Sequence, residues 1–177
     1  MIIQIRGTSG SGKSTVVRKI METFDFTPVF TDGRKQPLYY VADRLLILGH
    51  YESPCGGCDT IGSARKVFEL TQKLLDSGAT IVQEGLLLSE DTKWSSQLPD
   101  LRVLFLTTPV DECLSRIVSR RAKVGNEKPL NPSNTTNRVA VIERARVKLS
   151  NLGIECRRAS SEQAPGIVLK WIRQASR

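Results

Sequence analysis

A glycine-rich segment near the N-terminus has the composition and spacing of a loop that holds phosphate. It fits the pattern G-x-x-x-x-G-K-[ST] at every defined position and consists of Gly7, Thr8, Ser9, Gly10, Ser11, Gly12, Lys13, Ser14 and Thr15. Glycines let the backbone curl so that successive N–H groups point at one anion. Lys13 then reaches the β- and γ-phosphates of a nucleotide, and the Ser14 hydroxyl is placed to bind Mg²⁺. The segment therefore predicts a site for a nucleoside triphosphate and magnesium.

The flanking residues favour this interpretation over a chance glycine-rich turn. Ile2, Ile3 and Ile5 indicate a short buried strand directly before the loop, and a helical pattern runs from Lys13 to about Thr23. A helix that starts at the loop adds its positive N-terminal end to the anion site. The sequence has no N-K-x-D motif for guanine recognition, so we expect the nucleotide to be ATP.

Two carboxylates follow expected strands at the edge of the sheet where ligands bind. Asp32 comes after residues 28–31 and Glu84 after residues 80–83, and ligands bind at the carboxyl ends of parallel strands. Phosphoryl transfer uses a carboxylate beside the acceptor hydroxyl and often another beside the magnesium. Either acid can fill either role, because no hhhhD signature shows which one binds Mg²⁺. The alternatives are a turn-forming aspartate before Gly33 and an ordinary loop acid.

Asp59 is a third candidate, for contact with the substrate. It is followed by Thr60 and by a helical pattern over residues 61–76, which is more typical of a helix N-cap. We therefore expect a capping role first and retain Asp59 as a candidate substrate-binding residue.

Arginines recur on one face of a helix that is expected to follow Thr108. Arg116 and Arg120 lie four residues apart with Arg121 beside them. The chain resembles the P-loop kinases in its phosphate loop, and in those kinases the corresponding lid has arginines that neutralise the phosphoryl group in transfer. We expect Arg120 to act in catalysis and Arg116 and Arg121 to bind the nucleotide; the alternative is a solvated helix face. Residues 111–148 hold nine Lys or Arg against four Asp or Glu, a net +5 in a chain of +8.

The composition of the whole chain limits the number of domains, the cellular location and the type of partner that we expect. Its 177 residues are 40% hydrophobic, which suits one domain with its own core. The N-terminus lacks the apolar stretch of a secretory signal, and no segment approaches about 20 apolar residues, so we expect a cytoplasmic protein without a membrane segment. A net charge of +8 is commoner in proteins that meet nucleic acid than in enzymes of small anionic metabolites.

Strands and helices alternate along the chain, which predicts an α/β fold with a parallel sheet covered on both faces. The expected core strands are residues 2–5, 28–31, 80–83, 101–107 and 154–156, with a β-hairpin inserted over residues 38–48. Helices are expected at residues 13–23, 61–76, 109–121, 137–152 and 166–175, with Thr108 as an N-cap. The polar residues 123–137 are expected to lack regular structure.

The sequence GHYESPCGGCDT contains the single histidine and a Cys-x-x-Cys pair. Cys55 and Cys58 could be half of a zinc site completed by His50 and a further cysteine, Cys113 or Cys156, or they could be a redox pair. No thioredoxin-like context surrounds them. We therefore expect small buried thiols in a tight loop.

From the phosphate loop onward the chain resembles the small P-loop kinases of the nucleoside monophosphate kinase-like group. The resemblance rests on the loop and on the order of the elements over most of the chain. It implies a three-layer α/β/α P-loop NTPase fold with a five-stranded parallel core, ATP and Mg²⁺ as cofactors, and a single kinase domain over residues 1–177. It also implies an insertion at about 33–60 and a helical lid at about 116–137. Some of these kinases have an acceptor-binding aspartate similar in position to Asp32.

The segment 49–60 resembles a GHYE–CGGCDT signature of kinases encoded by DNA bacteriophages, some of which phosphorylate 5-hydroxymethyluracil within DNA. The segments GRKQP and NPSNTTN are similar as well. This resemblance implies that His50 and Tyr51 contact or stack on a base. If DNA is the substrate, the charge of the chain predicts that the lid and the segment with Arg34 and Lys35 lie along DNA phosphates. The alternatives are a kinase for a nucleotide or small metabolite, and an NTP-hydrolysing switch or partner-binding ATPase, which would phosphorylate no acceptor.

Overall fold

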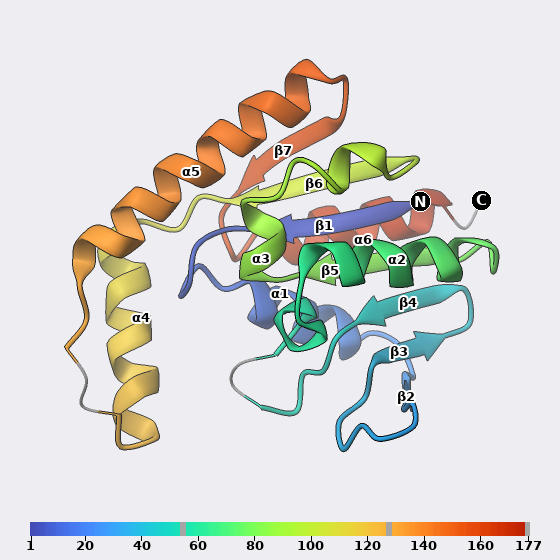
Figure 1. The fold of residues 1–177 in the computed structure, drawn as a ribbon, viewed down its shortest axis with the longest axis horizontal. Coiled ribbons are helices and arrows are strands. Elements are labelled where there is room, and N and C mark those ends of the chain that lie inside the picture. Colours follow the sequence, from blue (N-terminus) through green and yellow to red (C-terminus); the bar gives the residue numbers. More distant parts are fainter. Residues whose placement is uncertain (54–55, 127–128, 176–177) are drawn as a thin grey trace.

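The computed structural model describes residues 1–53, 56–126 and 129–175, and within these ranges seven strands form a sheet in the order β2-β3-β4-β5-β1-β6-β7 (Figure 1). The strands are β1 (Ile2–Arg6), β2 (Thr27–Val29), β3 (Tyr39–Ala42), β4 (Leu45–Leu48), β5 (Thr80–Glu84), β6 (Leu101–Leu106) and β7 (Glu155–Ala159). Strands β4, β5, β1, β6 and β7 run parallel. Strands β2 and β3 pair antiparallel at one edge.

The predicted number of five parallel strands is confirmed, but one member differs. The sequence places residues 28–31 in the parallel core, whereas β2 is an edge strand that pairs antiparallel with β3. Leu45–Leu48 takes that place: all four residues are buried, and the strand pairs parallel with β5. A central strand of a parallel sheet is covered on both faces, which suits an all-apolar segment, while Pro28 suits an edge because it lacks an N–H. The hairpin over residues 38–48 therefore continues the sheet.

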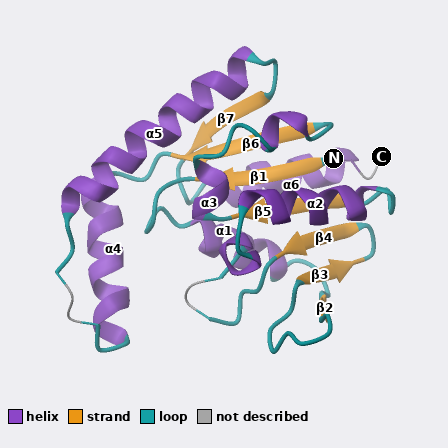
Figure 2. Ribbon diagram, in the orientation of Figure 1, coloured by secondary structure: helices purple, strands orange, loops and turns teal. Residues whose placement is uncertain are grey.

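Helices cover both faces of the sheet and give the predicted three layers (Figure 2). The α-helices are α1 (Lys13–Met21), α2 (Ala64–Leu75), α3 (Leu86–Ser89), α4 (Val110–Lys123), α5 (Pro132–Asn151) and α6 (Ala164–Ala175), with 3₁₀ helices η1 (Cys58–Ile61) and η2 (Ser95–Gln97). On one face Val17 of α1 and Trp171 of α6 join a core with Ile5. On the other, Phe68 of α2 and Ile142 of α5 pack in a second core. In the ranges described, no helix combines the length and apolar character needed to cross a membrane.

Thr108 does not cap the helix that follows it. Helix α4 begins at Val110 after Pro109 and has no side-chain cap. The Thr108 hydroxyl instead donates to the Ser11 carbonyl oxygen at 2.8 Å. The predicted N-cap is therefore wrong, because the hydroxyl is used to hold the phosphate loop.

Helix α5 begins earlier than the sequence predicts. Its first residue is Pro132 rather than Asn137, so part of the polar stretch over residues 123–137 is helical. The Asn131 side chain caps the helix by accepting a hydrogen bond from the Ser133 N–H at 3.0 Å. An asparagine N-cap followed by proline at the first position is a strong start signal, and it outweighs the polar composition.

A chain of buried polar side chains crosses one face of the sheet beside the phosphate loop. Arg6 is fully buried and donates to the Gln4 side-chain oxygen at 3.1 Å, the Asp91 carbonyl at 2.6 Å and the Ser95 hydroxyl at 2.6 Å. Burial lowers the pKa of Arg6 to about 10, although Asp91 acts to raise it. The guanidinium therefore stays charged at neutral pH, and it ties β1 to the segment that follows α3.

We expect Arg6→Met to lower the free energy of unfolding by roughly 2–4 kcal/mol, because the buried oxygens of Gln4, Ser95 and Asp91 lose their donor. Arg102→Met is the matched control. Arg102 is 26% exposed and pairs with Glu155 at 3.2 Å, so its loss should cost less than about 1 kcal/mol. Urea unfolding followed by circular dichroism measures both changes. Equal losses in the two variants would contradict a special role for the buried arginine.

Candidate active site

The phosphate loop connects β1 to α1 and curls at two glycines. Gly10 and Gly12 have φ angles of +79° and +96°, in the left-handed region that favours glycine. Helix α1 then begins at Lys13, and its first N–H groups have no partner within the helix. Lys13 is buried, and its Nζ donates to the carbonyl oxygens of Gly7 at 2.9 Å and Thr8 at 3.0 Å. The loop therefore brings the Lys13 ammonium group close to the free N–H groups at the start of α1.

The first turns of α4 pack directly on this loop. A Cβ at Gly10 would collide with the main chain of Cys113, so only glycine fits beneath α4. Arg116 donates to the Gly10 carbonyl at 3.3 Å and pairs with Glu112 on the same helix. Arg116 and Arg120 both line the space beside the loop. Arg116 and Arg120, two of the three arginines predicted to act on the nucleotide, thus lie next to the predicted phosphate loop.

Glu84 ends β5 beside the loop, as the sequence predicts, because β5 pairs parallel with β1. The Ser14 hydroxyl donates to Glu84 Oε1 at 2.8 Å, and the glutamate is 2% exposed. Burial raises the pKa of Glu84, and Lys13 and the Ser14 hydrogen bond oppose that rise. Burial likewise lowers the pKa of Lys13, and Glu84 opposes that fall. Each charge therefore offsets part of the cost of burying the other.

Asp59 caps a helix, but a different one from the helix that the sequence suggests. Helix α2 is capped by Ser63, whose hydroxyl accepts from the Lys66 N–H at 3.2 Å. The Asp59 carboxylate instead accepts from the N–H groups of Leu86 at 2.9 Å and Leu87 at 3.0 Å, at the start of α3. This contact joins η1 to the residues directly after Glu84, and it orients the Asp59 carboxylate at the site.

These groups line one cavity of about 670 Å³, a size typical of small-molecule sites. The predicted residues that line it are Ser9, Gly10, Gly12, Lys13, Ser14, Thr15, Asp59, Glu84, Arg116 and Arg120. Residues that the sequence analysis did not single out also line it: Arg18, Lys19, Gly56, Thr60, Leu86, Ser161 and Glu162. The cavity thus brings the phosphate loop together with two of the three candidate carboxylates and two of the three candidate arginines.

Asp32 does not line this cavity. It is exposed in a turn in which the Arg34 N–H donates to the Thr31 carbonyl at 3.0 Å and Gly33 has a φ of +77°. The prediction that Asp32 ends a parallel core strand is wrong, because β2 ends at Val29 and pairs antiparallel. The alternative interpretation, a turn-forming aspartate, describes its position.

Three predicted basic contacts also lie outside the cavity lining: Arg34, Lys35 and Arg121. Arg34 and Lys35 belong to the connection between β2 and β3, where Lys35 is exposed. Arg121 is partly buried on α4. Their contacts with nucleotide or DNA stay predictions.

The structure leaves no open ring face on His50 or Tyr51, which corrects the expectation that they stack on a base. The two side chains are 2% and 6% exposed, and the Tyr51 hydroxyl donates to the Leu48 carbonyl at 3.2 Å. Stacking needs an accessible face. Arg18 of α1 holds the same segment from outside, donating to the carbonyls of Tyr51 at 3.1 Å and Ser53 at 2.7 Å. The rings therefore position the loop from within.

The cysteines are distributed over different elements. Cys58 is fully buried with its Sγ 3.8 Å from the Leu48 carbonyl oxygen, and burial raises the pKa of its thiol well above the usual range. Cys113 belongs to α4 and Cys156 to β7, while Cys55 lies outside the described residues. Over the described ranges, no group of three or more His, Cys, Asp or Glu side chains could hold a metal ion.

The sequence contained signals for three of the missed cavity residues. Arg18 lies one helical turn after Ser14 and so on the same face of α1. Ser161 and Glu162 follow β7 at its carboxyl end, the position that directed attention to Glu84. The close approach of Gly57 to Glu84 had no local signal, because the two residues meet through the fold.

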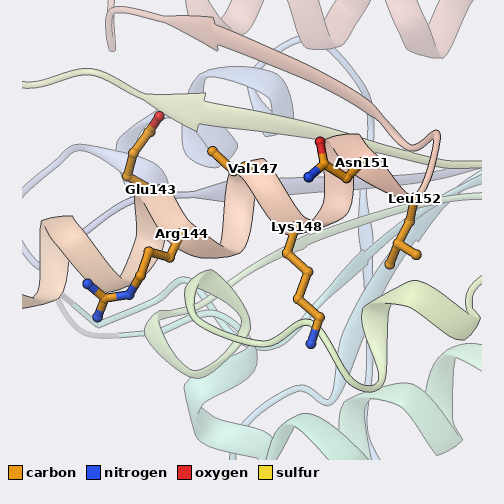
Figure 3. A pocket seen from close by; sticks show the side chains of 6 residues that line it. All are labelled: Glu143, Arg144, Val147, Lys148, Asn151 and Leu152. Carbon is orange, nitrogen blue, oxygen red and sulfur yellow. The ribbon is translucent and has the colours of Figure 1, made fainter.

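A second hollow of about 420 Å³ lies on the C-terminal half of α5 and shares no lining residue with the cavity (Figure 3). Its lining consists of Glu143, Arg144, Val147, Lys148, Asn151 and Leu152. Val147 and Leu152 are 44% and 58% exposed. Since all the lining comes from one helix and the residue after it, this is an open surface feature.

Comparison with known proteins gives relatives from bacteriophages. No protein-family model matches the chain. A 5-hmdU DNA kinase of Pseudomonas phage PaMx11 is 43% identical over 145 residues, which cover 76% of this chain and 77% of that protein. A 5-hmdU DNA kinase of Pseudomonas phage M6 is 28% identical over 161 residues, which cover 82% of this chain and 83% of that protein.

Two solved structures share the fold. A deoxyadenosine kinase from M. mycoides with bound dCTP superposes with a TM-score of 0.51 at 14% identity, covering 98% of this chain and 100% of that chain. The YorR protein of Bacillus subtilis, in complex with phosphorylated GDP, gives a TM-score of 0.50 at 14% identity, covering 100% and 99%. At this identity the likeness concerns the fold alone, and it confirms the predicted P-loop kinase fold.

Gly57→Ala should damage the site, because a Cβ there would collide with the Glu84 carboxylate. We expect turnover to fall by about 10²-fold, the scale of a 1 Å misplacement of a reacting group. Gly78→Ala is the matched control: its φ of +68° is close to the +71° of Gly57, but no atom lies within 4 Å of its Cβ position. The control should lose only about 1–2 kcal/mol of stability through backbone strain. Equal turnover in the two variants would argue against a close fit at Glu84.

Proposed function

The chain belongs to the family of the 5-hmdU DNA kinases, and on this premise we propose that it transfers the γ-phosphoryl group of ATP to the 5-hydroxymethyl group of 5-hydroxymethyluracil in DNA. The observation that carries the proposal is the 2.8 Å hydrogen bond from Ser14 to Glu84. It places a hydroxyl and a carboxylate side by side at the first turn of α1, the helix that starts at the end of the phosphate loop. The names of the phage relatives support the acceptor.

The polar groups of the loop fit the triphosphate of ATP. Lys13 and the free N–H groups at the start of α1 are donors for phosphate oxygens. Gly7, Thr8 and Ser11, the other predicted residues of the loop, do not line the cavity, and within the described residues the buried hydroxyls of Thr8 and Ser11 have no hydrogen-bond partner. Arg116 and Arg120 bring positive charge from α4, where it can stabilise the phosphoryl group in transfer.

Ser14 and Glu84 fit a magnesium site. Magnesium in kinases keeps one or two protein oxygens and takes its remaining ligands from phosphates and water, so a hydroxyl and a carboxylate 2.8 Å apart are a suitable donor set. When bound, the ion would neutralise negative charge on the β- and γ-phosphates. The buried Glu84 carboxylate is held in place for this role by the Ser14 hydroxyl and by the charge of Lys13.

Asp59 is the carboxylate assigned to the acceptor in this proposal. Glu84 is assigned to magnesium together with Ser14, which leaves Asp59 as the other predicted carboxylate of the cavity; its two oxygens each accept one backbone N–H and keep further lone pairs. The acceptor oxygen forms a bond to the γ-phosphorus while the bond from that phosphorus to the β–γ bridging oxygen breaks, and ADP leaves. The proton of the acceptor hydroxyl passes to Asp59, which orients the hydroxyl before transfer.

A polymeric acceptor is supported by the charge of the chain. The net +8 exceeds what one triphosphate requires, and DNA supplies phosphates beyond the reacting nucleotide. The hydroxymethyl group lies on a base, so the base must be reached in the major groove or turned out of the stack into the cavity. Because the named relatives are phage proteins, the proposal places the reaction in the cytoplasm of the infected host.

Replacing Glu84 and Asp59, two of the three carboxylates that line the cavity, should separate their roles. We expect Glu84→Gln and Asp59→Asn each to lower turnover by about 10²-fold or more, the scale for loss of a metal partner or general base. Only Glu84→Gln should raise the magnesium concentration needed for half-maximal rate. Asp32→Asn, at the exposed turn, is the control and should stay within a few-fold of the unmodified protein. A loss in Asp32→Asn as large as that in Glu84→Gln would contradict the assignment.

Labelled ATP and a panel of acceptors test the proposed reaction. We expect transfer to hydroxymethyluracil DNA, little transfer to normal DNA, and none with Lys13→Ala. Better transfer to free hydroxymethyl-deoxyuridine or its monophosphate would make the protein a nucleotide or small-metabolite kinase. ATP hydrolysis without any phosphorylated acceptor would indicate an NTP-driven switch. Circular dichroism of Lys13→Ala shows whether its loss of activity is a loss of fold.

A further inference from the structure

An open surface hollow of about 340 Å³, called the groove below, lies on the C-terminal half of α4; like the hollow on α5, it is lined by one helix and the residue after it. It is lined by Ser115, Arg116, Ser119, Arg120, Lys123 and Val124. Arg116 and Arg120 line both the cavity and the groove, so the two hollows meet at these residues. Helix α4 stands away from the sheet, at the left of Figure 1. The groove residues that do not line the cavity, Ser115, Ser119, Lys123 and Val124, are exposed to solvent.

The chemistry of the groove differs from that of the cavity. Three of its six lining residues are cations, two are serines and none is a carboxylate. The cavity, in contrast, includes Asp59, Glu84 and Glu162 among its lining residues. A surface with cations and hydroxyls but no acid suits a ligand with repeated negative charge, and it contains no group for acid–base chemistry.

Two of the groove's cations have no carboxylate partner among the described residues. In the part of the chain that the structure describes, neither Arg120 nor Lys123 forms an ion pair, whereas Arg116 pairs with Glu112. Lys123 is exposed in the last turn of α4. Charges without a carboxylate partner are available to phosphates, and placing them on an open groove avoids the cost of burying them.

The spacing of the cations fits a nucleic-acid strand. Positions 116, 120 and 123 recur at three- and four-residue intervals, which keeps them on one face of the helix. The intervals correspond to about 4.5–6 Å along the helix axis. Each strand of DNA advances by about 3.4 Å per phosphate, so successive cations lie within one or two nucleotide steps of each other.

We propose that this groove binds the phosphates of the DNA strand that flank the nucleotide held in the cavity. The identity of the polymer rests on the proposed function; the groove and its charge do not. The reacting base enters the cavity, and the strand leaves it along α4, where Arg120 marks the junction and Lys123 the outer end.

Removing one charge from the groove tests this assignment on DNA binding alone. Lys123→Gln should weaken binding of an unmodified duplex and flatten the log–log salt dependence by about 0.9, the slope for one phosphate contact. Lys170→Gln, at an exposed lysine of α6, changes the net charge equally and should leave the slope unaltered. Fluorescence anisotropy between 50 and 200 mM salt measures both slopes. ATP affinity should be unchanged in Lys123→Gln, because Lys123 lines the groove and not the cavity.

Acceptors of different length separate this proposal from the proposed function. With hydroxymethyluracil oligonucleotides, the KM of the unmodified protein should fall as the strand lengthens, and Lys123→Gln should lose that gain at unchanged kcat. Equal slopes for Lys123→Gln and Lys170→Gln would overturn the groove assignment even if the DNA is phosphorylated. A flattened slope in Lys123→Gln without phosphorylation of hydroxymethyluracil DNA would sustain the groove and overturn the proposed reaction.

Discussion

The parallel pairing of β1 with β5 is the constraint on which the site depends. Ile5 lies opposite Glu84 in this pairing, so the strand that enters the phosphate loop and the strand that ends in the carboxylate reach the same edge together. The Ser14–Glu84 hydrogen bond and the mutual electrostatic support of Lys13 and Glu84 follow from that register. A shift of one residue in β5 would turn Glu84 to the opposite face of the sheet and leave Lys13 buried without its counter-charge.

The proposed acceptor side is built by contacts between segments that are distant in the sequence. Arg18 of α1 holds the carbonyls of Tyr51 and Ser53, and Asp59 holds the start of α3 directly after Glu84. The segment from residue 49 to 60 is therefore attached to both elements that form the donor site. In the proposed function, this arrangement would fix the acceptor relative to the phosphates, which in-line transfer requires.

Features marked by residues close together in the sequence could be predicted, whereas features that depend on contacts between distant segments could not. The phosphate loop could be predicted because a strand, a glycine pattern and a helix follow one another within a few residues. The layered fold could be predicted because strands and helices alternate along the chain, and Glu84 because it directly follows an expected parallel strand. The position of Asp32 could not, because local hydrophobicity does not show which neighbour a strand pairs with, and β2 pairs antiparallel at the edge. The contact of Asp59 with Leu86 spans 27 residues and has no local signature. The start of α5, in contrast, is marked by Asn131 and the proline after it, and these two local signals prevail over the polar composition around them.

If the proposed function holds, the distribution of carboxylates lets a small domain combine catalysis with binding of a polymer. Carboxylates in the cavity repel the phosphates of a ligand. Two of them have a structural contact that accounts for their presence: Glu84 accepts from the Ser14 hydroxyl, and Asp59 accepts from the N–H groups at the start of α3. Buried next to Lys13, Glu84 is partly neutralised before any ligand arrives. The groove on α4 has no acid–base role and carries cations and hydroxyls without acids. A DNA strand that runs from the groove into the cavity would thus have its phosphates next to cations along α4. It would lie next to carboxylates only at the single nucleotide that reacts. In this proposal, selectivity for the reacting base depends on the cavity residues around Asp59, because phosphate contacts along α4 do not depend on base identity.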